Sequence, residues 1–164
     1  MIKIYQTIID KVHGNCMQAV IASLFEVPLE TVPNFNSFGQ EWFKVFYKFI
    51  SEQGYNYDGC LYNYNQWSII NKREGKPTAK LRNRLYKIKK MEGVNGYFYA
   101  SVYSPKYYNS TDKPPITHAV IIDKNFNIVH DVNPNNIGLT IYPESKKLKY
   151  NGILNIYMIN PISK

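Results

Sequence analysis

The 164 residues, of which 45% are apolar and 20% charged, have the length and composition of a single globular domain, residues 1–164, and exclude a disordered or fibrous chain. No apolar run reaches the roughly 18 residues that cross a membrane, and the start of the sequence lacks a secretory signal, so we expect a cytoplasmic protein. The net charge of +8 is carried by residues 72–90, which hold nine basic side chains and one acidic one, while the rest of the chain is balanced.

Two segments in the first third of the chain have the periodicity of helices. Residues 16–25 and 37–52 both place apolar side chains three and four positions apart, so each is predicted to bury one face in the core. Pro28 follows the first helix and Gly54 ends the second. The apolar positions are Met17, Val20, Ile21 and Leu24 in the first helix, and Trp42, Phe43, Phe46, Phe49 and Ile50 in the second.

The remainder of the chain is dominated by strand patterns. Residues 55–71 have no clear period and are predicted to be irregular, and residues 72–90 have the narrow apolar stripe of an exposed helix. β-Branched and aromatic residues predict strands at 97–103, 117–123, 126–132 and 153–159. Helices that precede strands are typical of an α+β domain, in which N-terminal helices pack on a C-terminal antiparallel sheet.

The two cysteines, Cys16 and Cys60, are too few for a disulfide scaffold and are predicted to be free thiols. Cys16 stands at the first position of a predicted helix, with Asn15 as its N-cap and Gln18 as the capping-box partner. The positive end of the helix dipole favours a thiolate there, and Gly14 lets a substrate approach closely. The other interpretation of Cys16 is a small buried apolar side chain, as most free cysteines are. We expect Cys60 to be structural.

A nucleophilic cysteine needs a base, and the sequence offers three histidines, His13, His118 and His130. His13 lies only three residues before Cys16, in a predicted loop, which disfavours it as the base. Side chains alternate along a strand, so Asp123 lies on the opposite face from His118 and cannot readily orient it. We predict that His118 is the base and that His130 is structural or a minor substrate contact.

The pairing of the two histidine-bearing strands decides which residue orients His118. A two-residue loop at Lys124 and Asn125 places Asp131 opposite His118 and matches apolar residues with apolar ones. A register shifted by two residues offers Asn133 instead, and a β-bulge would change either pairing. Because a buried face strongly specifies register, we prefer Asp131 as the orienting carboxylate and keep Asn133 as the alternative.

Five segments toward the two ends of the chain form a recognisable pattern. They are GNCMQA at 14–19, ASL at 22–24, VPNF at 32–35, HAV at 118–120 and VHDVNP at 129–134. Together they resemble a family of papain-like cysteine-peptidase-fold proteins, mostly uncharacterised, from phages and bacteria. The resemblance implies a papain-like α+β fold with Cys16 as nucleophile, His118 as base and Asp131 as the residue that orients it.

Papain-like enzymes commonly use a glutamine upstream of the cysteine to assist the oxyanion hole. The upstream glutamine in this chain is Gln6, and its separation of ten residues from Cys16 is longer than usual. The backbone N–H of Cys16 would be the other donor. Asn15 and Asn133 are the expected supporting residues of the site.

The leading functional hypothesis is a thiol-dependent acyl-transfer enzyme, most simply a cysteine peptidase or isopeptidase acting on a peptide or protein. The alternative is a phage accessory or anti-defence protein that binds nucleic acid, a nucleotide signal or an acidic partner through residues 72–90. Its candidate contacts are Lys80, Arg82, Arg84 and Lys87. A zinc site on His13 and Cys16 lacks a second pair of ligands, and phosphate-loop and dinucleotide motifs are absent, so we expect neither metal nor cofactor.

Overall fold

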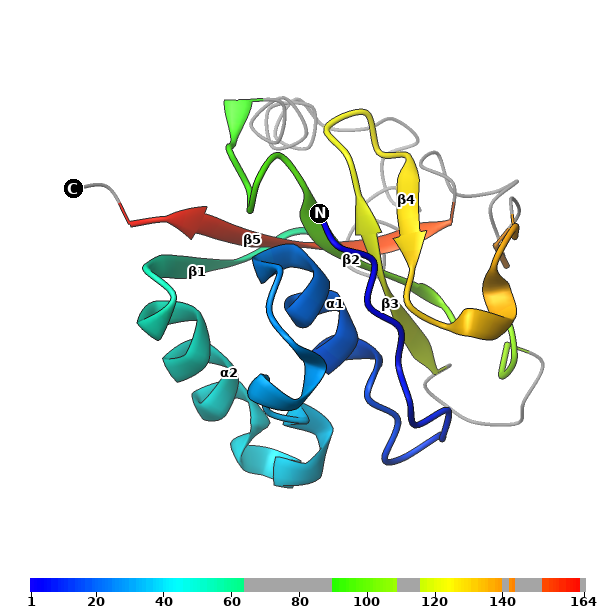
Figure 1. The fold of residues 1–164 in the computed structure, drawn as a ribbon. Coiled ribbons are helices and arrows are strands. Elements are labelled where there is room, and N and C mark those ends of the chain that lie inside the picture. Colours follow the sequence, from blue (N-terminus) through cyan, green and yellow to red (C-terminus); the bar gives the residue numbers. More distant parts are fainter. Residues whose placement is uncertain (64–89, 109–115, 140–141, 144–151, 163–164) are drawn as a thin grey trace, which may run out of the picture.

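The computed structural model describes residues 1–63, 90–108, 116–139, 142–143 and 152–162, with residues 60–63 given by their backbone alone. An extended N-terminal segment leads into two α-helices, and the strands follow (Figure 1). The helices are α1 (Cys16–Phe25) and α2 (Trp42–Glu52), with the 3₁₀ helices η1 (Leu29–Thr31), η2 (Phe35–Glu41) and η3 (Pro134–Asn136). The strands are β1 (Tyr55–Asn63), β2 (Phe98–Tyr103), β3 (Thr117–Ile122), β4 (Ile128–Asp131) and β5 (Ile153–Pro161).

The strands form one five-stranded antiparallel sheet in the order β1-β5-β2-β3-β4. Helix α1 packs against β2 and β3, and α2 packs against β1 at the other end of the sheet (Figure 1). The four predicted strands are present close to their expected ends, and the α+β class predicted from the sequence is confirmed.

Strand β1 contradicts the irregular structure expected for residues 55–71, as far as the described residues extend. It pairs with β5, and the register shifts on both sides of Cys60. Gly59 lies at the first shift with φ of 94°, a conformation that costs glycine little. Such irregularities interrupt the alternation of side chains, so the sequence carries no strand period there.

The two faces of the sheet are buried by different groups of side chains. Ala119 and Ile121 of β3 belong to an apolar cluster that also contains most of α1. Val120 and Ile122 belong to a second cluster, which includes Phe126 of the following loop. Alternation along one strand therefore supplies two apolar clusters, one on each face of the sheet.

Helix α1 is buried around most of its circumference, whereas the sequence predicts one buried face. Residues 19–24 are each at most 1% exposed, because α1 packs on the sheet and the N-terminal segment runs beside it (Figure 1). Ser23 is among them, and its hydroxyl donates to the carbonyl of Ala19 at 2.8 Å and accepts from the N–H of Ile4 at 2.9 Å. These bonds satisfy the polar group and tie the N-terminal segment to α1.

The α-helix predicted from residue 37 begins instead at Trp42. The preceding residues form η2, which bends at Gly39, where φ is 53° and ψ is −124°. This left-handed conformation interrupts a regular α-helix and favours glycine.

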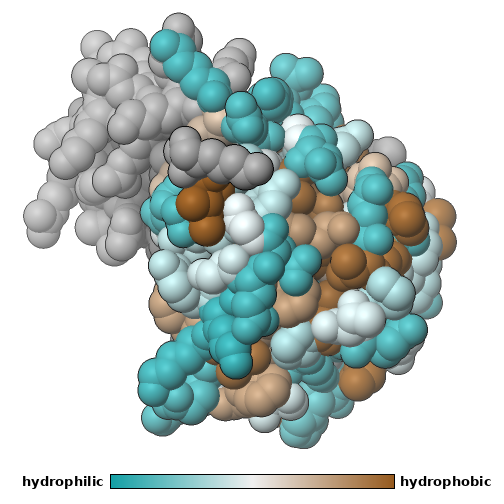
Figure 2. Space-filling view, turned by 60° about the vertical axis from the view of Figure 1, so that its left-hand side comes forward, coloured by the Kyte–Doolittle hydropathy of each residue, from teal (hydrophilic) through white to brown (hydrophobic). Residues whose placement is uncertain are grey.

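The aromatic positions of α2 are only partly in the core. Phe46 and Ile50 are buried, but Trp42 and Phe43 are 38% and 44% exposed, so the prediction that they lie in the core is wrong. Only a narrow stripe of α2 faces the sheet and η2. On this side of the molecule, apolar side chains reach the surface and are divided by a band of hydrophilic ones (Figure 2).

The basic segment 72–90 lies outside the described residues, apart from Lys90. The binding hypothesis that rests on this segment therefore stays a prediction. Its four candidate contacts, all outside the described residues, are Lys80, Arg82, Arg84 and Lys87. None of the helices in the described ranges has the length and apolar character needed to cross a membrane.

Candidate active site

Cys16 and His118 come together from the two halves of the chain. Cys16 is the first residue of α1, His118 is the second residue of β3, and their side chains share a hydrogen bond. The backbone N–H groups of Ala119 and Met17 also donate to the sulfur of Cys16. Cys16 is half-buried and His118 is only 6% exposed, so Cys16 is the more accessible of the two residues.

Asp131, the last residue of β4, lies on the other side of the imidazole. Its Oδ1 is 2.5 Å from Nε2 of His118, and both side chains are buried. Because this bond uses Nε2, the other ring nitrogen, Nδ1, is left for the Cys16 thiol. The structure thus brings together the three residues that the sequence analysis selected, in the order Cys16, His118, Asp131.

The strand register that places Asp131 there is not the preferred one. Of the two registers considered, the one shifted by two residues holds at the site, and the preferred register is wrong. The observed pairs are Val120 with Asp131, Ile121 with His130, and Ile122 with Ile128.

One extra residue in the loop and one in a β-bulge together produce the shift of two residues. The loop between the strands holds three residues instead of two: the N–H of Asp123 donates to the carbonyl of Asn127 at 3.0 Å, and Phe126 has φ of 65°. A two-residue hairpin loop favours Asn-Gly or Asp-Gly, which the chain lacks here. The register shifts again between Ile121 and Ile122, which leaves Val129 of β4 without a direct partner.

Asp131 still reaches His118 because a shift of two residues keeps every side chain on its own face of the sheet. The carboxylate and the imidazole are then diagonal neighbours, within reach of each other. Asn133, the alternative orienter, supports the acid instead: its backbone N–H donates to Oδ1 of Asp131 at 2.8 Å. Its side-chain oxygen accepts from the N–H of Asn135 at 3.0 Å, at the start of η3.

Two further residues bind the second carboxylate oxygen of Asp131, and the sequence analysis missed both. Nδ2 of Asn136 donates to Oδ2 at 2.9 Å, and the hydroxyl of Tyr142 donates to it at 2.7 Å. The position of Asn136 in η3, directly after β4, is a signal that the sequence analysis could have used. No pattern in the sequence pointed to Tyr142, which is brought in by the tertiary fold.

Burial favours neutral side chains at this site, and the local hydrogen bonds and charges reverse that preference. Burial raises the pKa of Cys16, but the hydrogen bond and charge of His118 outweigh it and lower the pKa below its ordinary value. Burial lowers the pKa of His118, whereas Asp131 and Cys16 raise it to about 9. Burial also raises the pKa of Asp131, yet His118 and the other donors hold it below its ordinary value. The site therefore favours a thiolate beside an imidazolium.

Asn15 connects the N-terminal segment to the beginning of α1. Its Oδ1 accepts from the N–H groups of Thr7 at 3.1 Å and Ile8 at 2.9 Å, and its Nδ2 donates to Gln18 at 3.0 Å. It makes no side-chain capping bond to α1, so the predicted capping box is wrong. Gln18 instead donates to two carbonyls of the chain that follows α1. Asn15 is thus a support of the site through the N-terminal segment.

Replacing Asn15 with alanine is expected to lower the free energy of unfolding by about 1–2 kcal/mol, because two backbone N–H groups lose their acceptor. Urea unfolding followed by circular dichroism would measure the change. Asn127→Ala is the control, since Asn127 is exposed and bonds Asp123 within the β3–β4 loop; it should change stability by less than about 0.5 kcal/mol. Equal effects of the two substitutions would contradict the prediction.

The N-terminal segment also carries Gln6 into the site. Its backbone N–H donates to the carbonyl of Val132 at 2.9 Å, and its side chain is buried beside the same cavity as Cys16 and His118. Nε2 makes one long bond of 3.4 Å to the carbonyl of Ile8, and Oε1 has no hydrogen-bond partner among the residues that the structure describes. The long spacing from Cys16 is accommodated because the residues between them form a loop. Gln6 therefore presents a weakly anchored amide to the site.

The cavity in front of Cys16 has both polar and apolar walls. It is lined by residues 9–11, Gly14 and Asn36, and by Ser104 and residues 106–107 and 116–117. Nδ2 of Asn36 donates to the carbonyl of Gly14 at 2.5 Å. A Cβ on Gly14 would collide with the carbonyl of Asp10, so the tight loop itself requires glycine there. The cavity lining also includes Gln6, Cys16, His118 and Asn133.

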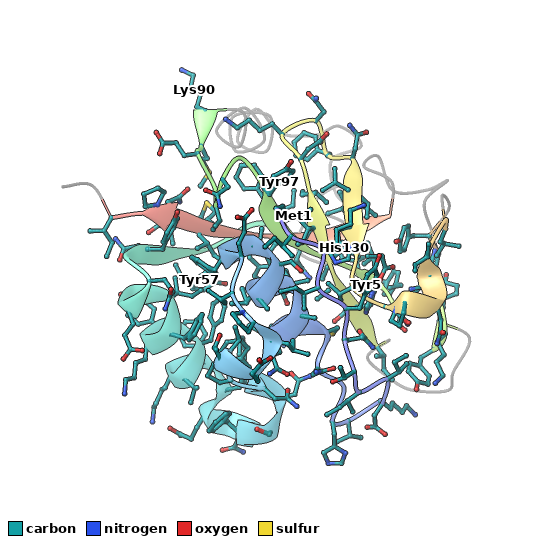
Figure 3. All side chains as sticks on the ribbon, viewed as in Figure 1. Met1, Tyr5, Tyr57, Lys90, Tyr97 and His130 are labelled. Atoms are coloured by element: carbon teal, nitrogen blue, oxygen red, sulfur yellow. The ribbon has the colours of Figure 1, made fainter. Side chains whose placement is uncertain are left out.

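The other candidate residues lie elsewhere. His13 is exposed, with Nδ1 at 3.4 Å from Oδ1 of Asp10. His130 is buried, bonds the carbonyl of Ile4 through Nε2 at 2.9 Å, and contacts the ring of Tyr5 edge-on at 5.0 Å (Figure 3). The side chain of Cys60 falls outside the described part. Among the side chains that the structure describes, no three His, Cys, Asp or Glu residues gather as metal ligands.

Comparisons with known proteins identify no relative. No protein-family model matches the sequence, no curated protein shows significant similarity to it, and no solved structure matches the fold. The geometry around Cys16 is therefore the basis for any statement about function.

Proposed function

We propose that this protein is a thiol-dependent acyl-transfer enzyme, most simply a cysteine peptidase or isopeptidase with a papain-like arrangement of helix and sheet. The observation that carries the proposal is the Cys16–His118–Asp131 chain, in which the cysteine begins α1 and faces a cavity. A small structural cysteine needs neither a histidine partner nor a carboxylate behind that histidine. A histidine base with a group that orients it is the arrangement that activates a cysteine nucleophile.

The reaction begins with the thiolate of Cys16 and the imidazolium of His118. The thiolate attacks an amide carbonyl carbon, which forms a C–S bond and places negative charge on the carbonyl oxygen. Collapse of this intermediate breaks the C–N bond, and His118 gives its proton to the departing amine. His118 then takes a proton from water, the hydroxide attacks the thioester carbonyl, and the carboxylic acid leaves as the thiolate is restored. An amine in place of water would give transfer instead of hydrolysis.

The charged oxygen of the intermediate needs hydrogen-bond donors in the cavity. The backbone N–H of Cys16 lies at the start of α1, where the helix dipole favours negative charge. The side-chain amide of Gln6 lines the same cavity and is held by one long bond. Gln6 is therefore the side chain that we assign to the oxyanion hole. Asn133 lines the cavity as well and keeps Asp131 in place.

The test is digestion of a complex peptide library at pH 7, with the products identified by mass spectrometry. The wild type should release new peptide ends and Cys16→Ala should release none, while Ser37→Ala, a change at an exposed hydroxyl of η2, should keep the activity. In parallel, intact-mass spectrometry with a peptide vinyl sulfone should show a single adduct on Cys16. Absence of both cleavage and adduct in the wild type would reject the proposal.

A further inference from the structure

We infer that Tyr142 and Asn136 are positioning residues, which lock the Asp131 carboxylate in the orientation that serves His118. The inference rests on the proposed function, since it concerns the same site. Neither residue faces the cavity in front of Cys16. Both donate a hydrogen bond to Oδ2 of Asp131, the oxygen that does not bind His118. Their effect on the thiol would therefore pass through the carboxylate and the imidazole.

The hydrogen bonds of Asp131 fall into two pairs. Oδ1 accepts from Nε2 of His118 at 2.5 Å and from the N–H of Asn133 at 2.8 Å. Oδ2 accepts from the hydroxyl of Tyr142 at 2.7 Å and from Nδ2 of Asn136 at 2.9 Å. A carboxylate with two donors on each oxygen has all of its acceptor positions occupied, so rotating the group would break hydrogen bonds without forming new ones. Loss of the Oδ2 donors would free one end of the group.

The two donors are themselves held rigidly. Tyr142 is 4% exposed and packs in the apolar cluster with Val120 and Ile122, on the face of the sheet opposite α1. Asn136 is the last residue of η3, and its backbone N–H donates to the carbonyl of Asn133 at 2.9 Å, which closes the turn. One donor is therefore fixed by the core and the other by the backbone. A rigid clamp of this kind fixes the carboxylate better than water would.

A second cavity explains why such a clamp is needed. It lies behind the acid and is lined by Asp131, Asn136, Tyr142 and His130, among others. Water in this cavity would compete for Oδ2 if the clamp were absent. Burial and the Asp131 carboxylate raise the pKa of Tyr142 well above its ordinary value, so its hydroxyl keeps its proton and remains a donor at every working pH.

The position of the Asp131 carboxylate beside His118 is what this clamp controls. The titratable groups that face His118 are Cys16 from α1 and Asp131 from β4, and the cavity walls add Asp10, Lys11 and Lys106. Removing a donor from Oδ2 weakens the hold of Asp131 on the imidazolium. The imidazolium of His118 then loses part of the stabilisation that offsets the cost of its burial, so its pKa falls. The thiolate–imidazolium pair then loses its proton at a lower pH.

The experiment is a pH titration of His118 by NMR in protein labelled with ¹⁵N-histidine, together with the rate of alkylation of Cys16. Tyr142→Phe removes one hydroxyl and keeps the ring. It should lower the pKa of His118, about 9 in the wild type, by roughly 0.5–1 unit. Asn136→Ala should shift it in the same direction, and the double variant should shift it further. Ile122→Val, in the same apolar cluster, is the packing control and should leave the titration unchanged.

The outcomes separate the two proposals. If the wild type shows the raised His118 pKa and Tyr142→Phe and Asn136→Ala both leave it in place, the clamp is rejected and the proposed function stands. If His118 in the wild type titrates near its ordinary value, the ion pair does not form and the proposed function falls first. A shift equal to that of Ile122→Val would assign Tyr142 to packing alone and also reject the clamp.

Discussion

A His118→Ala variant is expected to react with iodoacetamide at Cys16 on the order of 10–100 times more slowly than the wild type at pH 6.5. His118 is the largest of the influences that lower the pKa of Cys16. Without it, burial and the ordinary pKa of the thiol leave about 1% or less as thiolate at this pH. The difference in rate between the wild type and the variant is smaller than the difference in thiolate fraction, because a thiolate of lower pKa is intrinsically less nucleophilic.

The measurement is labelling with a limiting amount of reagent between about pH 5 and pH 9, read by peptide mass spectrometry. His13→Ala is the matched control, because His13 precedes Cys16 by three residues but is exposed and paired with Asp10. It should alkylate like the wild type. If the two histidine variants behave alike, or if Cys16 in the wild type reacts no faster than Cys60, the ion pair and the enzyme hypothesis both fail.

The pH dependence of the wild type has a definite sign. The pKa of His118 is raised, from 6.5 to about 9, so the stabilisation from its positive charge is complete below about 6.5 and is lost as the pH rises through about 9. The pKa of Asp131 is lowered, so its contribution is present above 3.8 and is lost as the pH falls through the lowered value. Because the pKa of Cys16 is lowered, alkylation should already be fast at acidic pH; above about pH 9 His118 loses its proton, but Cys16 remains a thiolate and still reacts.

A Phe35→Ala variant is expected to lose about 3–5 kcal/mol of the free energy of unfolding, the cost of a large cavity in a packed core. Phe35 is fully buried at the start of η2 and contacts the rings of Phe46 and Phe49 edge-on, with centroids at 5.4 Å and 6.2 Å. These contacts hold η2 and α2 together. The loss could approach the entire stability of a small domain, which is about 5–15 kcal/mol.

The matched control is Phe38→Ala, three residues along the same 3₁₀ helix. Phe38 is 45% exposed, so its removal should change the unfolding free energy by less than about 1 kcal/mol. Urea unfolding, monitored by tryptophan fluorescence and circular dichroism, would measure both variants. Similar losses for the two substitutions would show that burial at Phe35 does not stabilise this part of the fold.

Part of the candidate site could be predicted from local sequence. The spacing of apolar residues places a helix directly after Asn15, and that spacing alone puts Cys16 at the end of the helix where a thiolate is favoured. Strand alternation likewise separates His118 from Asp123. These rules depend on a few neighbouring residues, which is why they hold without knowledge of the rest of the chain.

Other predictions failed because the deciding contacts are distant in sequence. Strand β1 has bulges that erase its period, and its partner is β5 at the far end of the chain. Trp42 and Phe43 have the pattern of core residues, but the packing of α2 leaves both of them exposed. Asn15 makes no capping bond, because its side-chain oxygen accepts from N–H groups of the N-terminal segment instead of from those of α1.

The sequence by itself determined the α+β order of elements, the position of Cys16 at a helix start and the face of the sheet that holds His118. These properties follow from periodicity, which repeats every few residues and is set by backbone geometry. Only the tertiary structure decided the register of β4, the position of Gln6 beside the cavity and the hydrogen bonds from Tyr142 and Asn136 to Asp131. Such contacts join segments whose separation is fixed by loops and bulges, and their free energy depends on the packing of the whole domain.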